Sequence, residues 1–290
     1  MKKKQIKKIE VSEEFLLSAD AEPVRRVAES LYPSYLLKLA KRKLKIKPNP
    51  VPVLDYEFMV SKEGRWARIL AETTYAEQVM SDDNVDHTVV IFGSARIAEK
   101  PNRKKGAVDL SRYYTECREL AKKITEWSMS KATKESKQPF VITTGGGPAI
   151  MEAGNRGAHD VDGKTVGLNI SLPMEQSSNP YITPEYNFDF HYFFTRKFHF
   201  SYRAKAMIAF PGGFGTFDEL FEILTLIQTK KISKPCIIVL YGKEFWNRVV
   251  DFDYLVATGV ISKSDLKLFH ICDDVDNAFT LIEKHLKKFL

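Results

Sequence analysis

A glycine-rich turn between an apolar run and a helical pattern constrains this chain most. The turn consists of Pro211, Gly212, Gly213, Phe214, Gly215 and Thr216. The apolar run at 206–210 predicts a buried strand, and apolar residues recur at helical spacing from Leu220 onward. Glycine lets a backbone approach a ligand and adopt positive φ, and a helix amino terminus presents free N–H groups to an anion. The sequence therefore predicts that the turn's glycines and the Thr216 hydroxyl bind a phosphate.

Two further loops follow apolar runs in the same way. Gly145, Gly146 and Gly147 come after the run at 140–143, and Gly93 and Ser94 come after the run at 88–92. From about His87 onward such runs alternate with amphipathic helical patterns, which predicts an α/β fold with a parallel sheet and helices on both faces. Ligands bind at the carboxyl ends of such strands. We therefore expect the three loops to form one nucleotide site, in which the two further loops border the base and the ribose.

Residues 1–86 lack the alternation of apolar runs and helical patterns seen in the rest of the chain. Prolines interrupt this part, and helical spacing is visible at about 24–44 and 63–80. The sequence predicts a helical amino-terminal extension over 1–86 and a nucleotide-binding α/β domain over 87–290.

Composition excludes several classes of protein. The formal charge of +7 lies largely in basic runs at 2–8 and 41–47, which are typical of a solvated tail and a solvated helix end, so nucleic acid is not an expected partner. No segment approaches the ~18 apolar residues of a membrane span, and a cytoplasmic location is expected. Cys117, Cys236 and Cys272 are odd in number and far apart, as core residues are, so we expect no disulfide, metal site or cofactor.

The motifs together resemble the LONELY GUY (LOG) family, whose members were formerly labelled lysine decarboxylases. The resemblance rests on residues 211–219, on Arg196 and Lys197 before them, and on the motif at 145–153, and it extends from about residue 87 to the carboxyl terminus. It implies that 87–290 form a catalytic domain with a Rossmann-like, doubly wound fold. The reaction it implies is hydrolysis of the N-glycosidic bond of a nucleoside 5′-monophosphate to free base and ribose 5-phosphate. The substrate it implies is AMP or a related purine or cytokinin nucleotide, and the assembly is a homodimer or a higher homo-oligomer.

Two residues are the candidates for catalysis. Cleavage at an anomeric carbon needs a carboxylate that activates water or stabilises the sugar cation, and Glu219 is our candidate. The alternative is structural, because Thr216 and Glu219 have the spacing of a helix capping box. The resemblance implies that Arg196 contacts the nucleotide, with Lys197 and Glu152 as further substrate contacts.

Other interpretations remain open at this point. A non-catalytic nucleotide or molybdopterin-cofactor carrier could use the same fold, although the presence of both Arg196 and Glu219 favours an enzyme. Nothing in the chain resembles the Schiff-base lysine context of a pyridoxal-phosphate decarboxylase. His191 and His199 lie among aromatic residues, which is typical of core or interface histidines. Lys205 stands where compact plant-type members commonly carry an acidic residue, which speaks against cytokinin nucleotides as the specific substrate.

Overall fold

The computed structural model of the chain describes residues 52–101, 108–133, 136–172, 177–232 and 235–290. The chain divides into two compact units, Met1–Arg65 and Trp66–Leu290. In the first unit lie a short 3-10 helix η2 (Pro52–Leu54) and the helix α4 (Tyr56–Val60), which Asp55 caps by accepting the Phe58 N–H. The helix expected at 24–44 and the two basic runs lie outside the described residues.

The helix expected at 63–80 is present as α5 (Arg65–Asp82). Ala76 and Met80 of this helix are buried in the same apolar cluster as strand residues such as Val90. All but the first residue of α5 therefore belongs to the second unit, whereas the sequence pattern assigned it to an extension ending at residue 86.

The second unit contains a seven-stranded, fully parallel sheet in the order β4-β3-β2-β1-β5-β6-β7. Nearly every residue of the five central strands is buried, as expected for a parallel sheet covered on both faces. The strands are β1 (Thr88–Phe92), β2 (Val141–Thr144), β3 (Thr165–Ile170), β4 (Asn187–Phe190), β5 (Ala204–Ala209), β6 (Ile237–Tyr241) and β7 (His270–Cys272).

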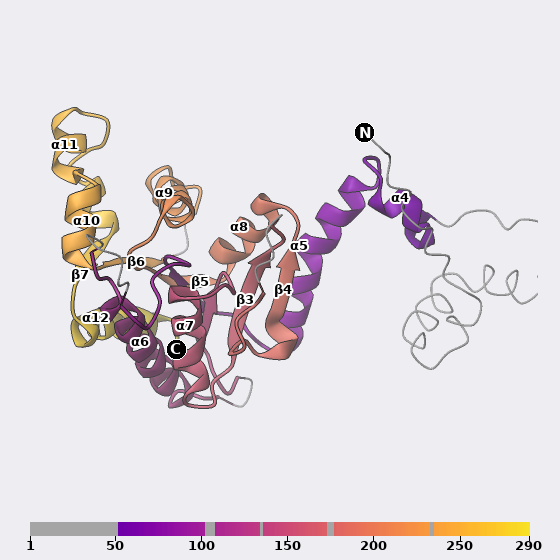
Figure 1. Cartoon of the computed structure of the whole chain (residues 1–290), viewed down its shortest axis with the longest axis horizontal. Coiled ribbons are helices and arrows are strands. Elements are labelled where there is room, and N and C mark those ends of the chain that lie inside the picture. The colour runs from indigo at the N-terminus through magenta and orange to yellow at the C-terminus, as the bar shows by residue number, and fades with distance from the viewer. Residues whose placement is uncertain (1–51, 102–107, 134–135, 173–176, 233–234) are drawn as a thin grey trace, which may run out of the picture. The chain divides into compact units, whose positions relative to one another are not determined.

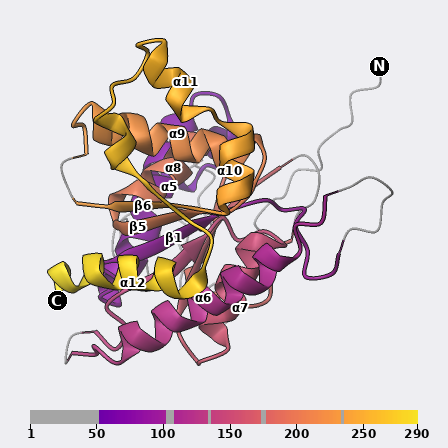
Figure 2. The same ribbon diagram turned by 90° about the vertical axis from the view of Figure 1, so that its left-hand side faces the viewer.

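Helices cover both faces of this sheet (Figures 1 and 2). Successive strand side chains point to opposite faces, so Val89 and Ile91 join one apolar cluster while Val90 and Phe92 join the other. On the first face lie α6 (Arg112–Met129), α7 (Ile150–His159) and α12 (Val275–Leu286). On the second face lie α5, α8 (Phe193–Tyr202), α9 (Phe214–Gln228), α10 (Lys243–Val249) and α11 (Phe252–Ala257). Single 3-10 turns are η3 (Pro184–Tyr186), η4 (Asp265–Leu268) and η5 (Lys287–Phe289).

The predicted fold class is confirmed: the sheet is doubly wound, with its switch point between β1 and β5. Strands β1 to β4 progress toward one edge, and the chain then returns to place β5 on the other side of β1. The segments that leave these two strands are joined, because the Phe210 N–H donates to the Phe92 carbonyl at 2.9 Å and the Ser94 N–H to the Pro211 carbonyl at 3.1 Å. The crevice beyond such a switch point is where α/β sheets bind ligands.

Two carboxy-terminal elements were not expected from the sequence. They are β7, which is three residues long, and α12, which packs Ala278 and Ile282 against the first face. Among the described residues, no helix is both long enough and apolar enough to cross a membrane.

Candidate active site

A cavity of about 750 Å³ opens at the carboxyl ends of the central strands. That volume is within the range of small-molecule sites. Its walls come from the loops after β1, β2 and β5, from the end of β3, and from the first turns of α8 and α9. The predicted site residues that line it are Gly93, Ser94, Gly145, Gly147, Arg196, Gly213, Gly215, Thr216 and Glu219.

Helix α9 begins earlier than the sequence pattern indicated. Gly213 is its N-cap, and the Gly213 carbonyl accepts the N–H groups of Thr216 and Phe217 at 3.0 and 3.1 Å. Thr216 is therefore inside the first turn, and the capping box proposed for Thr216 and Glu219 is wrong. The N–H groups of Phe214 and Gly215 precede these two and have no acceptor within the helix, so this end of α9 can donate to an anion in the cavity.

The glycines of this turn leave space and do not supply left-handed backbone. Positive φ among the described glycines occurs at Gly146, Gly242 and Gly259, so the expectation of positive φ in the 212–215 turn is wrong. A Cβ built on Gly213 or Gly215 would have no heavy atom within 4 Å. The absent side chains therefore keep the wall of the cavity open at the start of α9.

Arg196 reaches the cavity from α8. Its Nε donates to the Leu168 carbonyl at 2.8 Å, and its guanidinium lies 5.0 Å from the centroid of the Phe200 ring. Burial lowers the pKa of Arg196, and the Glu219 carboxylate opposes that effect. A cation held in this way by backbone and ring is oriented to bind an anionic ligand or developing negative charge.

Glu219 lines the same cavity from the second turn of α9. Burial raises its pKa from 4.5 to about 7, although the charges of Arg196 and Lys197 act in the opposite direction. Asp218 and Glu222 add smaller upward contributions. A carboxyl group that titrates near neutrality can accept a proton from water and return it, as a general base requires.

The second glycine turn is held by polar side chains behind the cavity. Gly146 has φ of +72°, and a Cβ there would overlap the amide of Asn169. Asn179 donates from Nδ2 to the carbonyls of Gly146 and Gly147, each at 3.1 Å. Ala149, which precedes α7, also has positive φ, at 62°. Strained backbone of this kind gathers at functional sites.

Four predicted contacts do not line this cavity. Gly146 lies behind the wall, and Gly212 lines a neighbouring cavity of about 300 Å³. Glu152 accepts a hydrogen bond from the Tyr114 hydroxyl at 2.7 Å. Lys197 pairs with Asp218 at 2.9 Å and with Glu222 at 2.8 Å, so it connects α8 to α9. The predicted roles of Glu152 and Lys197 in binding substrate therefore have no support from their geometry.

Several lining residues were not singled out as site residues from the sequence. Arg96 adds a second cation, and its place directly after the loop at Gly93 and Ser94 was a usable signal. Asn169 is an exception, because its position on the strand predicted at 166–170 already indicated that it could reach the site; its Nδ2 is occupied by Asn187 Oδ1 and by the Phe188 carbonyl. The others are mostly apolar, and only the fold brings them together: Phe92, Ala95, Met151, Ile170, Leu172, Phe193, Phe214, Phe217 and Asp218.

The two histidines lie outside the cavity lining. His199 is buried, its Nε2 is 3.1 Å from the Glu72 carbonyl, and burial lowers its pKa. His191 is exposed. Of the three cysteines, Cys117 and Cys272 are buried and Cys236 is partly buried, and all three are free thiols.

Lys205 lies at the opposite edge of the sheet from the cavity. It is the second residue of β5, and its ammonium is 4.7 Å from the centroid of the Phe289 ring. The cavity forms at the carboxyl ends of the strands, whereas Lys205 lies near the amino end of β5. The basic residue at this position, where compact plant-type members commonly carry an acidic one, therefore does not bear on which base the substrate contains.

Comparison with known proteins gives a family match and several similar sequences. Residues 151–282 match the family described as "Possible lysine decarboxylase". The "Probable cytokinin riboside 5′-monophosphate phosphoribohydrolase LOG4" of Oryza sativa subsp. japonica is 26% identical over 195 residues, which are 67% of this chain and 75% of that protein. The cytokinin riboside 5′-monophosphate phosphoribohydrolase of Rhodococcoides fascians is 31% identical over 78 residues, or 27% of this chain and 39% of the relative.

A further sequence and a solved structure are also similar to this chain. LOG2 of Arabidopsis thaliana, also named a cytokinin riboside 5′-monophosphate phosphoribohydrolase, is 31% identical over 94 residues, which are 32% of this chain and 44% of that protein. A solved molybdenum cofactor binding protein from Rippkaea orientalis is 16% identical, with a TM-score of 0.40 over 69% of this chain and 96% of the other. The sequence matches confirm that this chain resembles the LONELY GUY family, as its glycine turns and Arg196 indicate.

Proposed function

We propose that the protein is a nucleoside 5′-monophosphate phosphoribohydrolase that acts on AMP or a related purine nucleotide. The observation that carries the proposal is that Arg196 and Glu219, a carboxyl of raised pKa, line one cavity beside the amino terminus of α9. The sequence relatives named cytokinin riboside 5′-monophosphate phosphoribohydrolases support the reaction class.

In this proposal each part of the substrate has a place. The 5′-phosphate binds at Gly213, Gly215 and the Thr216 hydroxyl, where N–H groups are free to donate. The Glu219 carboxylate takes a proton from water as the water oxygen bonds to the anomeric carbon and the bond from that carbon to the base nitrogen breaks. Arg196 stabilises negative charge on the phosphoribosyl group. The proton held by Glu219 is then available to the departing base.

A panel of nucleoside monophosphates tests the proposal. Ribose 5-phosphate and free base are expected from AMP, whereas adenosine should be a poor substrate because the donors of α9 would be left unpaired. Binding of AMP without release of adenine would instead favour a carrier protein on the same fold. Equal turnover of adenosine and AMP would contradict the placement of the phosphate at α9.

A further inference from the structure

Helix α8 carries Arg196 but has no cap of its own. Its N-cap residue, Tyr192, offers no side-chain hydrogen bond to the first turn. The carboxylate of Glu72, on α5, instead holds the two residues that lead into the helix: it accepts the N–H of His191 at 3.0 Å and the N–H of Tyr192 at 3.3 Å. The Thr195 hydroxyl, in the first turn, lies 2.8 Å from the same carboxylate and 2.7 Å from the Tyr192 carbonyl, and its one proton can go to either acceptor. A carboxylate from a helix distant in sequence therefore contacts both the entry to α8 and its first turn, where negative charge is favourable.

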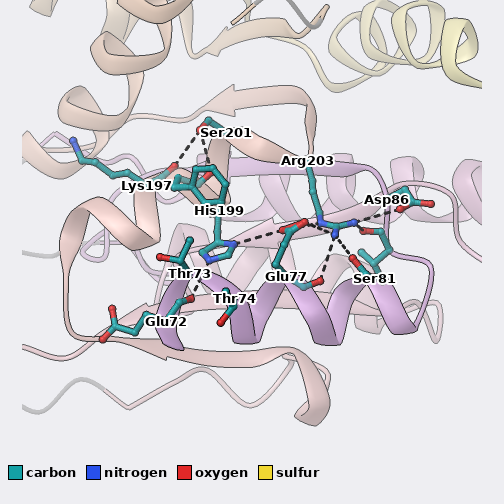
Figure 3. A network of polar contacts seen from close by, with 12 residues as sticks. Glu72, Thr73, Thr74, Glu77, Ser81, Asp86, Lys197, His199, Ser201 and Arg203 are labelled. Atoms are coloured by element: carbon teal, nitrogen blue, oxygen red, sulfur yellow. Dashed lines mark hydrogen bonds and ion pairs between the residues drawn. The ribbon is translucent and has the colours of Figure 1, made fainter. Parts of the chain in front are cut away.

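The same residue also contacts the far end of α8. The carbonyl of Glu72 is 3.1 Å from Nε2 of His199, whose ring is buried in the last turns of α8 (Figure 3). Glu72 is thus bonded to α8 through its side chain at one end and through its backbone toward the other. These contacts restrain both sliding and rotation of α8 along α5.

The restrained end of α8 is the end that enters the cavity. Thr195, which contacts Glu72, directly precedes Arg196, and Arg196 reaches the Leu168 carbonyl and the cavity from that turn. A shift of this turn therefore moves the guanidinium relative to Glu219 on α9. Misplacement of a catalytic contact by about 1 Å can lower a rate by ~10²-fold.

We infer that Glu72 is a positioning residue, which holds the first turn of α8 so that Arg196 stays opposite Glu219. The inference rests on the proposed function, because it takes the cavity as the active site. Glu77 on the same helix provides a contrast. It pairs with Arg203 and lies 3.9 Å from Nδ1 of His199, both toward the other end of α8, and Arg203 also donates to Ser81 and to the Val85 carbonyl (Figure 3).

The test compares Glu72→Ala and Glu72→Gln with two controls on α5. Glu77→Gln weakens the pairing at the far end of α8, and Gln78→Ala removes an exposed side chain that bonds only Asp82 among the contacts described. For each variant we would measure the melting temperature, kcat and KM for AMP, and the titration of the Glu219 carboxyl by ¹³C NMR. Comparison with Glu219→Gln assigns the Glu219 signal.

Glu72→Ala should lower kcat/KM by about 10-fold or more. It should also move the Glu219 titration to higher pH, because Arg196 and Lys197 are the cations that lower that pKa, while Asp218 and Glu222 raise it. Glu72→Gln keeps one oxygen acceptor and should fall between Glu72→Ala and the parent. Glu77→Gln should lower the melting temperature without moving the titration, and Gln78→Ala should change neither.

Two results would overturn the positioning role. One is an unshifted Glu219 titration in folded Glu72→Ala or, if that variant does not fold, in Glu72→Gln. The other is an equal shift in Glu77→Gln, since any loss of stability would then have the same effect. The NMR titration needs no turnover, so it separates the two proposals. A shifted titration in a protein that does not cleave AMP would contradict the proposed function and leave the positioning role standing.

Discussion

Gly145, the residue that follows β2, leaves the space that the guanidinium of Arg196 occupies. A Cβ at position 145 would overlap Nη2 of Arg196 and come within 2.9 Å of Sδ of Met151. The same guanidinium is fixed on its other side, because Nε of Arg196 donates to the Leu168 carbonyl. The glycine turn after β2 therefore acts on the site by admitting a cation from α8.

Replacing Gly145 with alanine should displace Arg196. We expect kcat/KM for AMP to fall by about 10- to 100-fold, the cost of a misplaced contact. The atoms that must move are the ends of flexible side chains, so the free energy of unfolding should change by no more than about 1 kcal/mol. Steady-state kinetics and thermal unfolding of Gly145→Ala measure the two effects.

A double-mutant cycle provides the control for Gly145→Ala. If the alanine acts by displacing Arg196, it should add little to the loss caused by Arg196→Ala, because both changes remove the same guanidinium from the cavity. Multiplicative losses in the double variant would show that Gly145 acts on the substrate by another route.

Replacing Gly215 with alanine should separate stability from binding. Gly215 is the second residue of α9, and its Cβ position is free of neighbours. Alanine at such a site should stabilise the folded protein by about 0.5–1 kcal/mol. The added methyl group would narrow the cavity where we place the phosphate, so KM for AMP should rise. A more stable variant with unchanged KM would place the phosphate elsewhere.

The sequence was sufficient to predict the framework of the site. Strand β1 was expected at 88–92 and is found there, and the loops after β1, β2 and β5 meet at one edge as expected. These predictions succeeded because apolar periodicity and glycine position are local signals, and because parallel strands bring their carboxyl ends together.

Contacts between distant segments were not predictable. Lys197 was predicted to contact the substrate, but in the structure it pairs with Asp218 and Glu222 of α9. The contacts of Glu72 with the residues that lead into α8 join positions more than a hundred apart, so no local sequence pattern indicates them. The start of α9 was misjudged because Gly213 and Thr216 are both acceptable N-caps, and only the carbonyl of Gly213 reveals which one is used.

The pairing of Lys197 leads to a prediction that contradicts its sequence-based role. Lys197→Met should lower the free energy of unfolding by at most about 1 kcal/mol, because the ammonium loses two carboxylate partners that are themselves exposed to solvent. At pH 8, where Glu219 is largely ionised, KM for AMP should stay within about threefold of the parent. A large rise in KM with unchanged stability would restore Lys197 as a substrate contact.

Because the pKa of Glu219 is raised, we expect both the stability of the protein and its catalytic rate to depend on pH. The variant Glu219→Gln tests both expectations. The folded-state pKa of about 7 lies above the ordinary value of 4.5. The native state therefore binds more protons than the unfolded state between pH 4.5 and 7. The contribution of this carboxyl group to the free energy of unfolding is largest below pH 4.5, and it is lost as the pH rises through 7. The glutamine has no such titration, so relative to the parent Glu219→Gln should gain stability over this window, by at most about 3 kcal/mol. Urea unfolding at several pH values measures the difference.

Catalysis should depend on pH in the opposite direction from stability. If Glu219 acts as a carboxylate, kcat/KM for AMP should fall as pH drops below about 7, and Glu219→Gln should reduce turnover by about 10²-fold or more. The substrate phosphate itself titrates near pH ~6, so the residual activity of Glu219→Gln, which retains only that titration, is the matched control. Glu219 does not cap α9, and the urea unfolding curves of Glu219→Gln check that a lower rate does not come from unfolding. Activity within a few fold of the parent would remove Glu219 from the mechanism and leave Arg196 as a ligand contact only.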